Sequence, residues 1–268
     1  MNDEHDTPAD DASLAEIVRP PAKAMGFFEH LEDLRWTLVK CAVVYVLFAA
    51  AIGIFLKEFN DALLWPFYYV KKDYPTLALD LGTTTIMEGF SIVVQICCAG
   101  ALVPATPFFL FFIGQFVAPA LTPKEIRMVL PVCVAAFLLF IVGAVFSFFM
   151  LMPNTLRVTI ELNEFFGFVM RWTAGSYYGL LTWLVLGVGA AFEFPLVILL
   201  LVYIGLLKVA TLRKYRRHAI VAIFIIAAIV TPTSDPFTMT MLVVPLYVLY
   251  EIAVLVGSRV EKRRPLAP

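Results

Sequence analysis

One carboxyl group lies in the middle of a long apolar segment. From Tyr177 to Leu207, Glu193 is the only ionisable side chain besides the tyrosines. With a helical rise of about 1.5 Å per residue, it would lie roughly 20 Å from either end of the segment, near the midplane of a ~30 Å hydrocarbon layer. Because a carboxylate facing lipid is costly there, we expect Glu193 to be neutral, paired or beside water, and to belong to a functional site.

A second group of acids precedes the first apolar segment. If residues 26–40 form a helix, Glu29, Glu32 and Asp33 fall on one side of it. The opposite side is apolar, with Phe27, Leu31, Leu34 and Leu38. The pattern predicts an amphipathic helix whose acidic face is either an ordinary solvated surface or a binding surface for cations. Adjacent carboxylates suit guanidinium groups, which they bind through two parallel hydrogen bonds.

Glu125 has an ordinary structural explanation. Thr122, Pro123 and Glu125 have the spacing of a capping box, with Thr122 as the N-cap and Pro123 at the first helical position. This arrangement predicts the start of a helix and an acid at position 125 whatever the protein does. Glu125 alone therefore indicates no function.

The common motifs of enzymatic chemistry are missing from the sequence. It has no Walker loop, no G-x-G-x-x-G, no H-E-x-x-H and no G-x-S-x-G, and its histidines are His5, His30 and His218. The cysteines lie in apolar segments without C-x-x-C spacing: Cys41, Cys97, Cys98 and Cys133. We expect no enzymatic activity, no cofactor, no metal and no nucleic-acid partner, which leaves a transporter, a receptor or a scaffold in the membrane.

The composition is that of a polytopic membrane protein. Of the 268 residues, 61% are hydrophobic and 15% are charged, unlike a soluble domain. We predict an all-α fold with six transmembrane helices, of which the last two are short: 38–57, 86–116, 128–152, 177–207, 219–231 and 237–257. Together they form one membrane domain, 25–257, between a disordered acidic tail, 1–24, and a basic tail, 258–268.

The basic residues predict the orientation of these helices. Fourteen of the 20 Lys and Arg residues flank the helices on one side of the predicted membrane domain, and the densest run is Arg213–Arg217. On the other side are Lys57, Lys71, Lys72, Arg157 and Arg171. Because the side richer in Lys and Arg faces the cytoplasm, the N-terminus and the C-terminus are both predicted to be cytoplasmic.

Several short motifs follow one another in a recognisable order. They are Glu29-His-Leu-Glu-Asp-Leu-Arg35, Phe116-Val-Ala-Pro-Ala-Leu121 leading to Glu125, Phe192-Glu-Phe-Pro195, Leu212-Arg-Lys-Tyr-Arg216, Thr231-Pro232 with Asp235, and Pro245-Leu-Tyr247 leading to Glu251. In this order they resemble the TatC family, the polytopic subunit of the twin-arginine protein translocase. The resemblance covers nearly all of the chain except its two tails.

The resemblance implies a function that the periodicity alone does not. It implies a non-enzymatic receptor in the cytoplasmic (inner) membrane of a prokaryote, which binds paired-arginine signal peptides of folded cargo proteins. Such a receptor assembles with single-span TatA and TatB type subunits, forms a homo-oligomer within the translocase, contacts membrane lipids and is driven by the proton-motive force. The arginine-pair site would then comprise Asp33 and Glu125, with Glu32, Arg35 and Phe116 beside them.

The resemblance also implies roles for residues inside the membrane. It assigns polar contacts or partner docking to Glu193, Thr231 and Asp235, and structural or kink positions to Pro66, Pro107, Pro119 and Pro195. The sequence departs from the family at two places. Asp33 replaces the usual glutamate and is one methylene shorter, so the arginine site would be set back or would recruit Glu32. Met239 occupies a position that is polar in some relatives.

The residues themselves leave two other functions open. One is a proton-coupled transporter of small solutes that uses Glu193 as its protonatable group. The other is a membrane scaffold in which Glu193 bonds a neighbouring helix.

Overall fold

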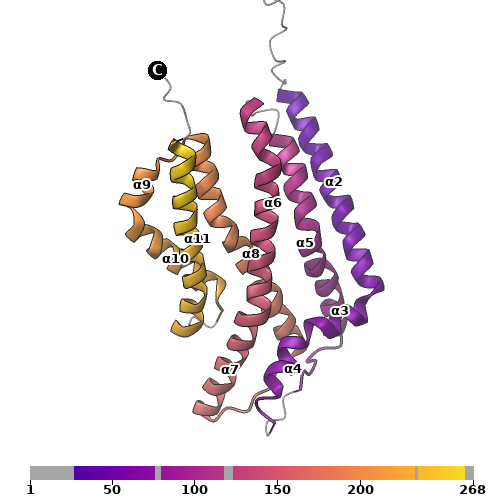
Figure 1. Ribbon diagram of the computed structural model, residues 1–268. Coiled ribbons are helices and arrows are strands. Elements are labelled where there is room, and N and C mark those ends of the chain that lie inside the picture. Colours follow the sequence, from indigo (N-terminus) through magenta and orange to yellow (C-terminus); the bar gives the residue numbers. More distant parts are fainter. Residues whose placement is uncertain (1–26, 76–79, 118–122, 233–234, 263–268) are drawn as a thin grey trace, which may run out of the picture.

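The computed structural model describes residues 27–75, 80–117, 123–232 and 235–262, and within these ranges the chain is helical (Figure 1). One isolated bridge between Gly82 and Thr173 is the only extended pairing among the described residues. The elements in chain order are α2 (Phe27–Ile54), α3 (Leu56–Leu63), α4 (Trp65–Lys71), α5 (Glu88–Val117), α6 (Pro123–Phe146), the π-helical turn η2 (Ser147–Leu151), α7 (Met152–Phe166), α8 (Ala174–Ile204), α9 (Val209–Lys214), α10 (Arg216–Val230) and α11 (Pro236–Lys262). The predicted all-α fold is confirmed.

Five helical segments in the described ranges are long and apolar enough to cross a membrane: Phe28–Ile54, Glu88–Val117, Val129–Phe166, Ala174–Ile204 and Pro236–Arg259. Each overlaps one of the predicted spans. Of the last two spans, both predicted to be short, the final one is wrong in this respect, because it belongs to the 27-residue α11. The remaining predicted span, 219–231, corresponds to α10, whose 15 residues give a length of about 22 Å, shorter than a ~30 Å hydrocarbon layer. That α10 crosses the membrane therefore stays a prediction. The two ends of the domain, Phe27 and Lys262, lie at the same end of the bundle, which we call the terminal end (Figure 1).

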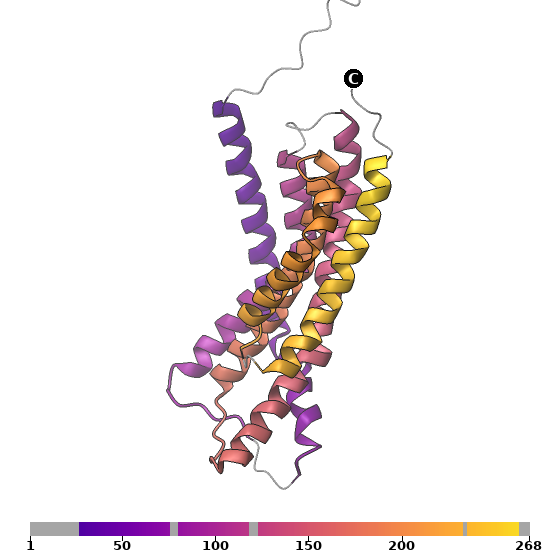
Figure 2. The ribbon, with the colours of Figure 1, turned by 90° about the vertical axis from the view of Figure 1, so that its left-hand side faces the viewer.

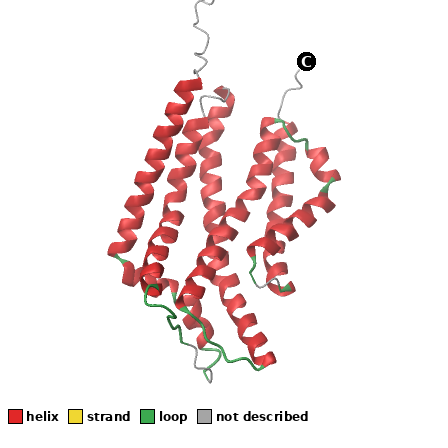
Figure 3. Ribbon diagram, turned by 180° about the vertical axis from the view of Figure 1, so that it is seen from behind, coloured by secondary structure: helices red, strands yellow, loops and turns green. Residues whose placement is uncertain are grey.

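The connection between the first two predicted spans is partly helical. It includes most of α3 and all of α4, which form the far end of the bundle together with α7 (Figure 3). Two tyrosines of α8 fasten α3: the Tyr177 hydroxyl donates to the Leu63 carbonyl at 2.7 Å, and the Tyr178 hydroxyl donates to Asn60. Pro66 lies in the first turn of α4, where a proline costs no helical hydrogen bond.

The third span does not end before Pro153 as predicted from the sequence. The helix continues through the π-helical turn into α7 and ends at Phe166, so the connection between the third and fourth predicted spans shortens from 153–176 to 167–173. The reason is the wider turn. The Met152 N–H donates to the Ser147 carbonyl five residues earlier, and a π-helical turn relieves the clash that Pro153 would cause with the carbonyl of an ordinary α-helical turn. Gly167, with φ 69°, then ends α7.

Glu88 joins the starts of two long helices at the far end. One of its carboxylate oxygens accepts from the Thr84 backbone N–H and hydroxyl, and the other accepts from the Gly175 N–H in the first turn of α8 at 2.9 Å. Nearby, the Gly82 carbonyl accepts from the Ala174 N–H at 2.8 Å. These bonds satisfy backbone donors that the first turn of a helix leaves free. The loops before α5 and α8 are therefore held together.

The central helix is α8, which packs against α5, α6, α10 and α11. It crosses α6 closely because both helices carry glycine at the crossing. A Cβ on Gly143 would lie 3.0 Å from the Val188 carbonyl oxygen, and one on Gly189 would lie 2.7 Å from the Phe140 ring. Small residues allow such close approach between membrane helices. The hairpin of α10 and α11 lies on the other side of α8 and stops short of the far end (Figures 1 and 2).

The crossing predicts opposite effects for two glycine substitutions. Gly143→Ala should lower the free energy of unfolding by about 1–3 kcal/mol, because the added methyl group presses on the backbone of α8. The matched control is Gly179→Ala, whose Cβ meets no atom within 4 Å and which should be neutral or stabilising by up to about 1 kcal/mol through helix propensity. Thermal unfolding of the detergent-solubilised protein measures both, and equal midpoints would contradict the packing described for the α6 and α8 crossing.

Candidate functional site

The acidic motif at the start of α2 lies beside the end of α5. The His30 ring stacks on the Phe116 ring with centroids 4.4 Å apart and planes 18° from parallel, and the two helices pack together. Residues more than 80 positions apart in the sequence thus meet at the terminal end. The structure therefore brings two of the predicted site motifs together.

The charged side chains of this region are accessible. Glu32, Asp33 and Arg35 are all exposed on α2. Position 125 lies in the first turn of α6, which begins at Pro123 as the capping pattern predicts, at the terminal end of the bundle (Figure 1). The side chain of Glu125 lies outside the described residues, as do Pro119 and Thr122. The geometry between Asp33 and the Glu125 carboxylate is thus not part of what the structure describes.

Glu193 lies half-buried on α8, next to the crossing with α6. The preceding Phe192 ring packs against the Gly143 position and lies 5.9 Å from the Phe146 ring. The Oε1 atom of Glu193 is buried and accepts no hydrogen bond from the described residues. A buried carboxyl oxygen without a partner is unusual, because most buried polar atoms are hydrogen-bonded. Pro195, also buried, lies inside a helix that continues past it to Ile204.

Thr231 is buried at the end of α10 and bonds within its own helix. Its hydroxyl and its N–H each lie 2.8 Å from the Ala227 carbonyl oxygen and donate to it. The neighbouring Val230 carbonyl accepts from the Trp183 indole of α8 at 2.9 Å. The threonine thus closes α10, and the indole fastens that end of α10 to the central helix.

Asp235 is the N-cap of α11. Its Oδ1 atom accepts from the Thr238 N–H at 2.7 Å, and its carbonyl accepts from the Met239 N–H at 3.1 Å. Pro236 follows as the first residue of the helix, as is typical of helix starts. Asp235 therefore has a structural role that the sequence analysis missed, although the Asp-Pro pair that indicates it is present in the sequence.

Two acids that the sequence analysis did not place in a site are engaged in bonds. Glu88 bridges α5 and α8, as described above. Glu251 of α11 accepts from Arg216 of α10 at 2.8 Å and from the Tyr247 hydroxyl at 3.0 Å. The four-residue spacing of Tyr247 and Glu251 indicates a shared helix face, but nothing in the sequence pairs them with Arg216. Part of the basic run Arg213–Arg217 thus closes the hairpin, besides any effect on orientation.

Comparison with known proteins gives a consistent family. The chain matches the family described as "Sec-independent protein translocase protein (TatC)" over residues 29–245. It is similar to the Sec-independent protein translocase protein TatC of Koribacter versatilis (strain Ellin345), with 30% identity over 259 residues, 95% of this chain and 93% of that protein. The corresponding protein of Deinococcus radiodurans is 30% identical over 262 residues, 97% of this chain and 95% of its own length.

The fold is similar to that of a solved structure. A crystal structure described as the twin arginine translocase receptor TatC in DDM superposes with a TM-score of 0.71 at 30% identity. The match covers 85% of this chain and 99% of that chain. The described helices thus account for nearly the whole of the solved relative.

Two substitutions at Asp235 separate capping from charge. Asp235→Ala should lower the free energy of unfolding by about 1 kcal/mol, because it removes the acceptor for the Thr238 N–H. Asp235→Asn keeps an equally good cap and should stay within a few tenths of a kcal/mol of the parent protein. Thermal unfolding measures the stability, and hydrogen exchange at Thr238 reports on the cap itself. If asparagine destabilises the protein as much as alanine does, the charge rather than the cap is what matters.

Proposed function

Because the chain belongs to the TatC family of Sec-independent protein translocases, we propose that it is the signal-peptide receptor of its translocase. As a family member it is a multi-pass membrane protein and a transport subunit of a translocase. The proposal is that it binds the paired-arginine signal peptides of folded cargo proteins and passes that cargo to an assembly of single-span TatA and TatB type subunits. The complex would act in the cytoplasmic membrane and be driven by the proton-motive force.

The observation that carries the proposal is the contact between the start of α2 and the end of α5. The stack of His30 on Phe116 holds the acidic motif next to the last turn of α5. Asp33 is exposed there, one turn along α2 from the stack. Two carboxylates near the surface favour two guanidinium groups, which they bind in a fork that the point charge of lysine does not match.

The orientation follows from the positions of the basic residues. The terminal end carries the start of α2, the start of α6 and the end of α11 (Figure 1). In the sequence, most Lys and Arg residues lie close to the helix ends on this side. With this end in the cytoplasm, the acids face the compartment in which folded cargo is made.

We assign Glu193 to partner docking. Its buried Oε1 atom lacks a partner among the described residues, and an unsatisfied polar atom in the membrane favours a hydrogen bond to another helix. A polar side chain of a single-span subunit would supply that bond.

The receptor site predicts a specific loss of binding. Asp33→Ala and Glu125→Ala should each weaken the binding of an Arg-Arg signal peptide by roughly tenfold, because each removes a charge-assisted contact to a guanidinium group. Asp33→Glu should retain binding. Photocrosslinking from positions 33 and 125 to Arg-Arg and Lys-Lys peptides measures the selectivity. The matched control is Glu164→Ala, which removes an exposed acid at the far end. Unchanged binding in the double variant with both Asp33→Ala and Glu125→Ala would refute the assignment.

Glu193 substitutions distinguish a docking role from proton transfer. Glu193→Gln keeps a hydrogen-bonding side chain and should retain association with the single-span subunits and most export, whereas Glu193→Leu should lose association. Co-purification and export of a folded cargo protein measure these effects. Loss of export in the glutamine variant with intact association, together with solute flux in vesicles that contain this chain alone, would favour a proton-coupled carrier instead.

A further inference from the structure

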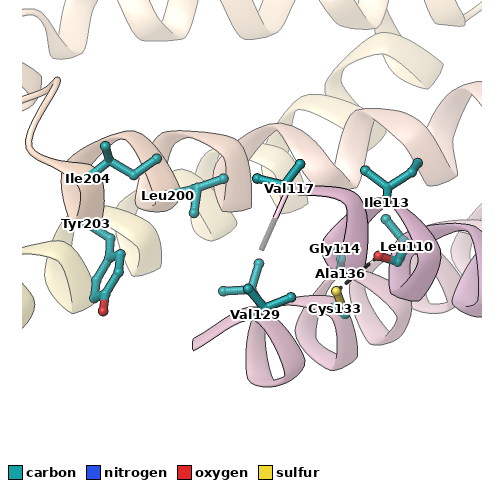
Figure 4. A pocket seen from close by; sticks show the side chains of 11 residues that line it. Leu110, Ile113, Gly114, Val117, Val129, Cys133, Ala136, Leu200, Tyr203 and Ile204 are labelled. Carbon is teal, nitrogen blue, oxygen red and sulfur yellow. Dashed lines mark hydrogen bonds between the residues drawn. The ribbon is translucent and has the colours of Figure 1, made fainter. Parts of the chain in front are cut away.

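An apolar pocket of about 250 Å³ lies between three long helices. The walls come from the last turns of α5, from α6 and from the last turns of α8, and Figure 4 shows Leu110, Cys133 and Leu200 facing this space from the three helices. Gly114 brings α5 close to α6 at this place, because a Cβ there would lie 2.7 Å from Val129. The pocket is therefore set between helices that already pack against each other.

The chemistry of the pocket favours an aliphatic or aromatic group. Among its lining residues, the polar side-chain groups are the Tyr203 hydroxyl and the Cys133 thiol, and none is charged. The thiol donates to the Leu110 carbonyl at 3.2 Å (Figure 4), so its hydrogen-bonding capacity is used. The volume is below the roughly 300–1,000 Å³ of pockets that enclose a whole small ligand. It suits one or two side chains.

The pocket adjoins the proposed arginine site. Val117 forms part of its wall and directly follows Phe116, whose ring stacks on His30. Val129, on the opposite wall, is four residues after Glu125, which is about 6 Å along α6. The acidic motif of α2 and the apolar pocket thus both lie beside the last turn of α5, at the terminal end of the bundle.

We propose that this pocket receives an apolar side chain of the signal peptide, from the stretch that follows its arginine pair. This proposal rests on the proposed receptor function. A segment with two cations followed by apolar residues matches both features, whereas a lipid acyl chain matches only the pocket. Exposed carboxylates give modest binding in salt, and burial of an apolar side chain supplies the additional affinity.

The native Cys133 provides a direct test. A variant with Cys41→Ala, Cys97→Ala and Cys98→Ala keeps Cys133 as its sole cysteine. Signal peptides with one cysteine at successive positions after the arginine pair are then oxidised with membrane vesicles that hold the complete translocase. Disulfide formation should peak at one or two neighbouring positions and fall with a Lys-Lys peptide. If no position reacts while direct binding of the Arg-Arg peptide persists, the pocket proposal is wrong and the receptor function stands. If both signals are absent, both proposals fail.

A paired substitution tests the pocket without cysteine chemistry. Val132 lines the pocket, and Val132→Trp should weaken binding of an Arg-Arg peptide by roughly ten- to a hundredfold, the loss expected when one large apolar side chain is no longer buried. The control is Val134→Trp on the outer face of the same helix, where Val134 is 50% exposed. Equal binding by both variants, with equal thermal stability, overturns the proposal. So does a photocrosslinker at position 132 that labels only lipid in the presence of saturating signal peptide.

Discussion

The close crossing of α6 and α8 is the contact on which the rest of the structure depends. In a membrane the lipid is as apolar as the helix surfaces, so helices associate through close packing and internal hydrogen bonds. Gly143 and Gly189 allow that packing where the two helices cross, and α8 is also the surface on which α5, α10 and α11 pack. Every long helix except α2 therefore packs directly against α8. Glu193 lies next to the same crossing, with its side chain half-buried.

The two ends of the bundle use polar groups in different ways. At the far end they bond to one another: Glu88 joins α5 to α8, Tyr177 holds α3, and Arg157 forms an ion pair with Asp73 at 2.7 Å. Such bonds hold the short helices and loops of this end against the long helices. At the terminal end, Glu32, Asp33 and Arg35 are exposed on α2, and the ring stack of His30 on Phe116 sets the position of that helix.

The hydrophobic pattern was sufficient to predict the helical class and the approximate positions of five long helices, and the capping pattern predicted the start of α6 at Pro123, because these features depend on local sequence. It failed where distant residues decide the structure. The helix α3 is fastened by tyrosines of α8 more than 100 positions away, and the continuation past Pro153 depends on a change in hydrogen-bond register. The motif resemblance named Asp33 and Phe116. Only the coordinates reveal the stack of His30 on Phe116 that brings their helices together, the Arg216 bond to Glu251 and the pocket at Cys133.

In the proposed receptor, the position of the acids constrains how one peptide is distinguished from another. A carboxylate on an exposed helix face is well hydrated, so a single contact to a cation contributes little net affinity and weakens further in salt. Selectivity for arginine over lysine must then come from geometry, since only the planar guanidinium forms two parallel hydrogen bonds with one carboxylate. That geometry is useful only if the carboxylate is fixed in position, and a short stack between α2 and α5 fixes it more firmly than a loop would.

The apolar surface next to the acids has the opposite property: it contributes affinity in proportion to buried area but little discrimination. Recognition divided between a rigid acidic surface and a neighbouring apolar one therefore gives both selectivity and affinity, and neither surface alone would suffice.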